Sequence, residues 1–218
     1  MAGDAVLFDC WGTLFTTAPA SGPAGPMGVL ADGLETEVDA DFRDVYEEAF
    51  MLEPHDGYAT PVRRLARAVG ADPDGETVTA MVKGLEQLAD VQVPYDDALP
   101  AVEAVRERGA AVALVTNTDA TSLARLRQSY PLDGTFDAVI ASCEVGALKP
   151  APAIFEAALD RLDARAGTAV MVGDSPRSDV WAARRLGLRA VLVDRGDKYG
   201  QLDHEPRVRD LTALGNHL

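Results

Sequence analysis

Four charged side chains have the types and positions expected of a catalytic site. Asp9 ends the apolar run AVLFD, and Asp174 ends TAVMVGD, with Asp179 five residues further on. Lys149 stands just before a proline in GALKPAPAIF, in a chain that has only three lysines. A carboxylate can act as a nucleophile, a lysine can neutralise it, and an acidic pair can hold a hard cation such as Mg²⁺. We therefore take these four residues as the candidate centre of the chemistry.

Residues beside these charges add hydrogen-bond donors and one anomaly. Thr116 and Asn117 close AVALVTN and offer a hydroxyl and an amide, and Gly12 forms a turn after Asp9 in DCWGTL. Trp11 occupies the position two residues after Asp9, where a second carboxylate would be expected to accompany the nucleophile. An indole only donates a hydrogen bond and does not titrate usefully. A positioned acid or base typically gives roughly 10²–10⁴ in rate, so a site with tryptophan at this position would lose that contribution.

The elements that must position these residues read as an α/β fold with a doubly wound parallel sheet. None of the five apolar runs alternates cleanly with polar residues, as expected for strands covered on both faces. Helical segments separate the later runs, and glycines stand where helix C-caps belong. Strand and helix in series predict a Rossmann-like domain. The predicted strands are 5–9, 111–117, 136–142, 168–174 and 189–194, and the predicted helices are 98–109, 120–130, 151–163 and 178–188.

The first and second predicted strands are separated by far more chain than a crossover needs. Residues 16–28 are rich in Gly, Pro, Ala and Thr and predict a flexible connection. Helical patterns follow at 36–53, 60–70 and 76–90. We therefore predict an inserted helical cap over 16–95, with residues 1–15 and 96–218 forming the core.

In order and spacing, the motifs FDCWGTL, LVTN, LKP and VGDSPRSD resemble those of the haloacid dehalogenase-like hydrolases, whose C1-type members carry a helical cap at the place of the insertion. The resemblance implies a phosphate-ester hydrolase acting on a small phosphorylated metabolite. Asp9 would be its covalent nucleophile, forming an aspartyl phosphate, and Lys149 would neutralise charge. The implied Mg²⁺ would be held by Asp9, Asp174, Asp179 and the backbone carbonyl of Trp11. Thr116, Asn117 and Gly12 would contact the phosphoryl group.

Trp11 leaves three interpretations open. The first is a magnesium-dependent phosphatase without this acid, which prefers good leaving groups or takes an acid from the cap, where His55 and Glu53 are candidates. The second is a 2-haloacid dehalogenase, whose branch has an aromatic residue at this position. Arg43 would then contact halide or carboxylate, but both motif acids are kept and Phe155 replaces an expected tyrosine. The third is a binding protein without turnover.

Composition limits the partners. The net charge of −15 argues against nucleic acid and anionic membranes, and no apolar stretch approaches the roughly 18 residues of a membrane span. The N-terminus has no signal-peptide pattern, and the two cysteines form no CxxC pair. We expect a cytoplasmic enzyme with a small-molecule substrate, as a monomer or homodimer. Aspartate-rich acidity with few lysines also predicts a salt-loving source.

Overall fold

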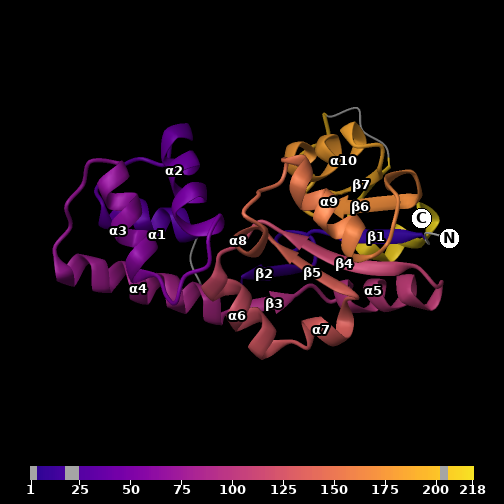
Figure 1. Cartoon of the computed structure of the whole chain (residues 1–218), viewed down its shortest axis with the longest axis horizontal. Helices are drawn as coiled ribbons and strands as arrows, with labels where there is room; N and C mark the ends of the chain where they lie inside the picture. The colour runs from indigo at the N-terminus through magenta and orange to yellow at the C-terminus, as the bar shows by residue number, and fades with distance from the viewer. Residues whose placement is uncertain (1–3, 18–24, 202–205) are drawn as a thin grey trace.

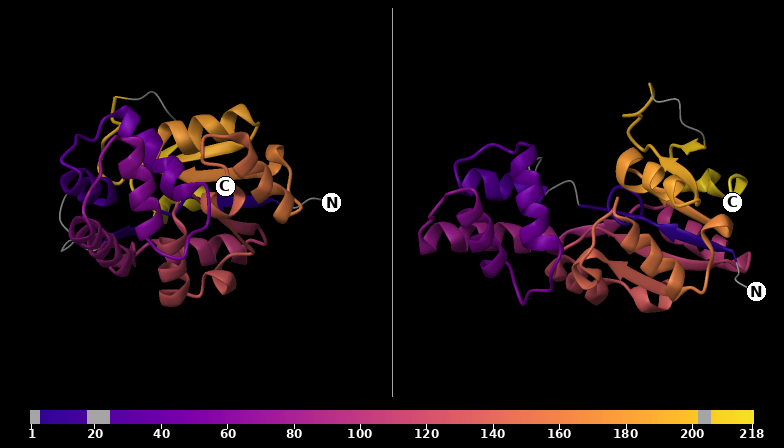
Figure 2. Two further views of the ribbon diagram at one scale, coloured as in Figure 1. Left: turned by 60° about the vertical axis from the view of Figure 1, so that its left-hand side comes forward. Right: turned by 45° about the horizontal axis from the view of Figure 1, so that its top comes forward.

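The computed structural model describes residues 4–17, 25–201 and 206–218. It has two parts, a sheet covered by helices and a separate group of four helices at one end of the molecule (Figure 1). The right-hand view of Figure 2 shows the same separation of the helical group from the sheet. Within the described ranges, no helix combines the length and the apolar character that crossing a bilayer requires.

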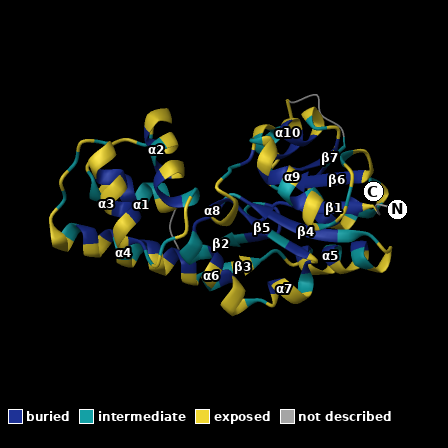
Figure 3. Ribbon diagram, in the orientation of Figure 1, coloured by how far each residue is buried: buried dark blue, intermediate teal, exposed yellow. Residues whose placement is uncertain are grey.

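The central sheet has the strand order β5-β4-β1-β6-β7-β8, and every neighbouring pair is parallel. Its strands are dark blue in the burial view, as their continuous apolar sequences predict (Figure 3). All five strands predicted from the sequence are present, and the short β8 adds an edge. The strands are β1 (Ala5–Phe8), β4 (Ala111–Thr116), β5 (Ala138–Ala141), β6 (Ala169–Gly173), β7 (Arg189–Val193) and β8 (Arg207–Val208).

Helices cover both faces of this sheet, which confirms the doubly wound α/β prediction. Successive β1 residues point to opposite faces, so that Phe8 belongs to one core cluster and Leu7 to the other. The first cluster lies under α5 (Ala98–Glu107), α6 (Ala120–Ser129), α7 (Leu132–Thr135) and η4 (Leu211–Asn216). The second lies under α9 (Pro152–Arg161), η3 (Pro176–Trp181) and α10 (Ala182–Arg185). The short α8 (Ser142–Val145) and η2 (Ala166–Thr168) lie in connections.

One predicted helix differs from the structure in a way that matters for the site. The pattern over 178–188 predicts a regular α-helix, but the chain first makes a wide π-helical segment, η3, and only then becomes α-helical in α10. Ser175 caps it by accepting a hydrogen bond from the Ser178 amide at 3.1 Å. Wide turns of this kind are frequent at functional sites. Here the turn carries Asp179.

The four helices at the other end form a unit that we call the helical module. They share a hydrophobic core of their own that includes Leu30, Phe50 and Leu65. Asp39 and Asp74 begin α2 and α4 by accepting backbone N–H groups three residues on, each at 2.8 Å. The helices are α1 (Gly25–Gly33), α2 (Ala40–Met51), α3 (Ala59–Ala68) and α4 (Gly75–Asp90).

The predicted flexible connection over 16–28 is wrong where the structure describes it. Its start belongs to β2 (Phe15–Thr17), which pairs antiparallel with β3 (Gln92–Pro94), and its end belongs to α1. Residues 18–24 lie outside the described part of the chain. Composition alone does not distinguish such strand and helix ends from a loop.

Candidate active site

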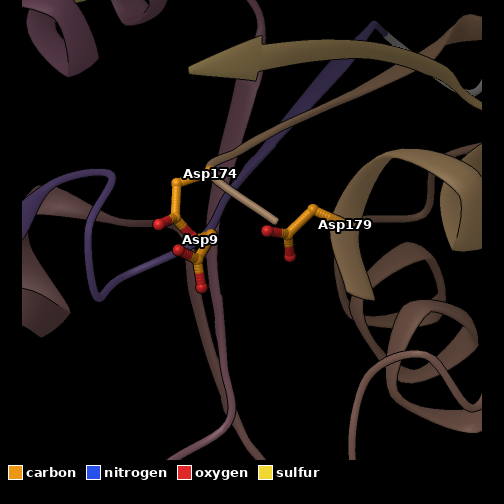
Figure 4. A group of neighbouring side chains, drawn as sticks. All are labelled: Asp9, Asp174 and Asp179. Atoms are coloured by element: carbon orange, nitrogen blue, oxygen red, sulfur yellow. The ribbon is translucent and has the colours of Figure 1, made fainter. Parts of the chain in front are cut away.

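Three carboxylates meet at the carboxyl ends of the central strands. Asp9 follows β1, Asp174 follows β6, and Asp179 projects from η3 (Figure 4). One oxygen of each lies within 4.8 Å of the others. The strand order places β1 between β4 and β6, so the chain reverses direction across the sheet at this point. Ligands of open α/β sheets bind in the crevice at this switch point.

Lys149 joins two of these acids. Its Nζ donates to Asp9 Oδ1 at 2.6 Å and to Asp179 Oδ1 at 2.8 Å, and all three side chains are almost completely buried. Asp9 Oδ2 accepts a hydrogen bond from the Thr13 hydroxyl at 2.8 Å, and Asp179 Oδ2 accepts one from the Ser175 amide at 2.9 Å. The structure therefore places Lys149 in the same site as the strand-end acids.

Two glycines allow the acids to come this close. A Cβ on Gly12 would stand 2.3 Å from Asp174 Oδ2, and one on Gly173 would stand 2.4 Å from Asp179 Cγ. Gly12 also has a φ of +79°, in the region that L side chains rarely adopt. Its amide donates to the Phe15 carbonyl at 2.8 Å. The predicted phosphate contact of Gly12 stays a prediction, since this amide is already engaged.

Burial and like charge together perturb the protonation of the acids. Burial raises the pKa of Asp174 to about 7, and the neighbouring Asp9 and Asp179 carboxylates add to the rise. Burial likewise raises the pKa of Asp179 to about 6, although the Lys149 charge opposes it. Burial alone would lower the pKa of Lys149, but Asp179 and Asp9 outweigh it and raise that pKa. The site therefore keeps its ammonium charged and has more negative charge than it can balance.

The side chain of Asn117 holds Lys149 from the backbone. Asn117 Oδ1 accepts from the Lys149 amide at 2.8 Å, and Asn117 Nδ2 donates to the Lys149 carbonyl at 2.9 Å. Thr116 is buried, and among the described residues its hydroxyl has no oxygen or nitrogen partner and faces the Cys10 thiol. The structure thus shows that Asn117 positions the Lys149 backbone, a role that the sequence did not predict. The predicted phosphate contacts of both residues stay predictions.

An arginine that the sequence analysis missed holds the turn after Asp9. Arg195 Nη2 donates to the Thr13 carbonyl at 2.8 Å, and the guanidinium pairs with both oxygens of Asp97 at 3.1 and 2.9 Å. The same guanidinium stacks 3.8 Å from the centre of the Tyr95 ring. Arg195 follows β7, so its place directly after an apolar strand was the available signal.

A cavity of about 360 Å³ lies between the core and the helical module, and it reaches the acidic site through Gly12, which packs against Asp174, and Asn117, which holds the Lys149 backbone. The core contributes Trp11, Gly12 and Asn117, which belong to the loops after β1 and β4. The helical module contributes aromatic and aliphatic side chains that include Tyr46 and Leu85. Trp11, half-buried, therefore forms part of the cavity wall.

The residues proposed as substitutes for the missing acid lie elsewhere. His55 and Glu53 border a second hollow inside the helical module, and Glu53 pairs with Arg64 at 3.2 Å. Arg43 is exposed on α2 and does not line the cavity beside Trp11. Phe155 is fully buried in the core under α9. These cap candidates are therefore not brought together with Asp9.

The acidic cluster fits a hard divalent cation. Its donors are all carboxylate oxygens, which Mg²⁺ prefers, and they converge from three directions on one volume. Asp9, Asp174 and Asp179 would hold such an ion.

Comparison with known proteins agrees with this architecture. The sequence profile of the haloacid dehalogenase-like hydrolases matches residues 4–187. A glyceraldehyde 3-phosphate phosphatase of Methanopyrus kandleri is 32% identical over 94% of this chain and 89% of its own length. A ribulose-1,5-bisphosphate 5-phosphatase of Halopiger xanaduensis is 30% identical over 89% of this chain and 86% of its own.

A solved structure shows the same fold over the whole length. It is a HAD phosphatase of Thermococcus onnurineus, 28% identical, covering 98% of this chain and 97% of its own with a TM-score of 0.65. The motifs, the doubly wound sheet and the strand-end acids thus have one explanation. The chain belongs to the family of haloacid dehalogenase-like hydrolases.

Proposed function

We propose that this hydrolase is a magnesium-dependent phosphatase of small phosphate monoesters that works through an aspartyl phosphate on Asp9. The observation that carries the proposal is the buried Lys149, which bridges Asp9 and Asp179 while Asp174 completes an acidic cluster. Relatives of similar length are named phosphatases. Bound Mg²⁺ would supply positive charge to the transferring phosphoryl group.

The first step would break the phosphorus–oxygen bond of the ester. A carboxylate oxygen of Asp9 attacks phosphorus, the leaving oxygen departs with the bonding electron pair, and it takes a proton from water. Lys149 orients Asp9 through its hydrogen bond, and its charge stabilises the charge that develops on the phosphoryl oxygens. Water then attacks the aspartyl phosphate, releases inorganic phosphate and restores the Asp9 carboxylate.

Trp11 decides which esters are turned over fast. Its backbone carbonyl would remain available to the metal, but its side chain gives no acid for the leaving oxygen. Esters with poor leaving groups would then react slowly, because general acid catalysis typically gives roughly 10²–10⁴ in rate. The preference for good leaving groups is the kinetic signature that this proposal requires.

The helical module is proposed as the cap of this site. Its side chains form one wall of the cavity beside Trp11, and Tyr58 and Ser122 share a hydrogen bond of 3.0 Å between the module and α6. Arg125 of α6 and Asp90 of α4 pair at 3.3 Å. We propose that residues 16–95 form this cap and that 1–15 and 96–218 form the catalytic core.

Hydrolysis of p-nitrophenyl phosphate tests the function. The purified chain is assayed with Mg²⁺ and with EDTA, at low and at molar salt, beside Asp9→Asn. Asp194→Asn is the matched control: Asp194 is also buried after a strand of the central sheet, but its partners there include the Lys198 and Tyr199 amides and, at 3.8 Å, Arg207. Activity that needs Mg²⁺ and Asp9 but survives in the control supports the proposal. Folded wild-type protein without activity at either salt level would refute it.

The dehalogenase alternative has one favourable feature, the aromatic Trp11, and two against it. Asp174 and Asp179 are both present, although a dehalogenase needs no metal. A 2-haloacid also needs a cation for its carboxylate, and Arg43 is not in the cavity. Halide release from 2-chloropropionate is the assay that would revive this alternative.

A further inference from the structure

We infer that the leaving group of the natural substrate is uncharged, largely apolar and free of any second acidic group. The inference rests on the proposed phosphatase function and names the class of ester on which that site acts. It comes from the side chains of the cavity beside Trp11, where the part of the ester beyond the phosphoryl group must lie.

The walls of this cavity are apolar. Trp11 and Phe15 contribute from the core side, and Tyr46, Leu85 and Leu88 contribute from the helical module. The volume of about 360 Å³ is at the small end of the usual range for ligand sites. A compact apolar body would gain by leaving water for such walls.

The charge of the cavity is negative. Asp119 is the one charged side chain among the described residues that line it, and it is 5% exposed. Burial raises the pKa of Tyr58, and the nearby Asp119 charge raises it further, so this phenol stays neutral. An anionic substituent would meet a carboxylate and no cation, which is costly away from water.

Cations near the site are committed elsewhere. Lys149 is held between two carboxylates, and the exposed Lys198 and Arg177 do not line the cavity. Residues 18–24, which the structure does not describe, have the sequence APASGPA and carry no charged side chain. Among the residues that the structure describes, no cation is therefore placed to pair with a carboxylate or a second phosphate in this cavity.

One polar atom that lines the cavity has no hydrogen-bond partner among the described residues. The amide oxygen of Gln92 is buried and accepts no hydrogen bond from the described residues, and Gln92 lines the cavity from β3. Buried acceptors are normally satisfied, so a donor on the ligand would have a place here. A hydroxyl on an otherwise apolar leaving group fits this requirement.

Three aryl phosphates test the inference on the full chain with Mg²⁺: phenyl phosphate, 4-(hydroxymethyl)phenyl phosphate and 4-carboxyphenyl phosphate. The carboxylate makes its phenolate the better leaving group, so intrinsic reactivity favours the anionic ester. We expect kcat/KM to be at least about tenfold higher for the two uncharged esters. In Gln92→Leu, the advantage of the hydroxymethyl ester over phenyl phosphate should disappear.

A cation placed in the cavity should weaken the preference for uncharged esters. Met51 ends α2, is half-buried and lines the cavity, so a long side chain fits there. Met51→Arg should lower the ratio of kcat/KM for the neutral esters to kcat/KM for the anionic ester by about tenfold or more, whereas the matched Met51→Gln should leave this ratio unchanged. Equal or faster wild-type turnover of the carboxyphenyl ester would overturn this inference alone. Absence of turnover for all three esters and for p-nitrophenyl phosphate would overturn the proposed function together with it.

Discussion

Replacing Lys149 by methionine removes one charge from the centre of the site and keeps most of its volume. Its Nζ lies 2.6 Å from Asp9 and 2.8 Å from Asp179, and the side chains are 3%, 8% and 1% exposed. At an effective dielectric constant of about 20, each attraction is about 6 kcal/mol. Desolvation of the three ions offsets several kcal/mol per ion. Loss of one partner of a buried pair typically costs about 3–5 kcal/mol, and we expect that loss here.

The variant is also expected to respond to pH in a defined direction. Without the ammonium, three carboxylates stand within 4.8 Å of one another, so the pKa values of Asp174 and Asp179 in the folded protein rise further. The folded variant then holds protons that the unfolded chain releases, and its stability falls as pH rises. The destabilisation by Lys149→Met should therefore be smaller at pH 5 than at pH 7.5.

Urea unfolding in EDTA at both pH values measures this effect, with Lys198→Met as the control for an exposed lysine. For a chain of this length, the expected loss lowers the melting temperature by roughly 6–20 °C. The control should change the free energy of unfolding by less than about 0.5 kcal/mol. A loss below about 1 kcal/mol at pH 7.5, or one that does not depend on pH, would refute the view that Lys149 neutralises a strained acidic cluster.

Three further predictions concern the same site, and a fourth concerns the surface. Trp11→Asp should raise kcat for alkyl phosphates by about tenfold or more, and an unchanged rate in folded, metal-binding protein would contradict the role given to Trp11. Gly12→Ala should lower kcat by about a hundredfold, since its Cβ would stand 2.3 Å from Asp174 Oδ2; wild-type kinetics would show that this contact yields freely. In metal-free protein, the raised pKa of Asp174, about 7, means that the folded state holds a proton the unfolded state releases, so stability should fall between about pH 4 and 7 by up to about 4 kcal/mol; Asp174→Asn should reduce this slope in urea titrations and leave the part below about pH 6 that Asp179 contributes. Molar KCl should raise the melting temperature, because the net charge of −15 repels itself; a melting temperature that falls from low to molar KCl would argue against the salt-loving source.

The sheet and the strand-end acids could be predicted from sequence because local chemistry determines both. A parallel strand buried on two faces needs an uninterrupted apolar run, and the five such runs became the five long strands of the sheet. Because those strands are parallel, their carboxyl ends meet at one edge. Residues as distant as Asp9 and Asp174 then share a site without any contact having been guessed.

Contacts between distant segments escaped prediction for the opposite reason. The bond from Asn117 to the Lys149 backbone and the clamp of Arg195 on the Thr13 carbonyl depend on where separate loops come to rest. The pairing of β2 with β3 joins segments on either side of the helical module, and neither sequence is long enough to predict a strand alone. Secondary-structure propensity depends on residues that are close in the sequence, whereas these contacts join residues that are close only in the folded structure.

The charge of the site connects these observations. Three carboxylates and one ammonium leave two negative charges in a buried volume, and a divalent cation is the simplest group that balances them. Without it, burial and then the neighbouring carboxylates raise the pKa of Asp174, the acid that Lys149 does not touch. Trp11 does not change this charge balance, because the carboxylate that it replaces would act on the leaving group and would not belong to the acidic cluster. The tryptophan would therefore alter which esters are cleaved while leaving metal binding and attack by Asp9 in place.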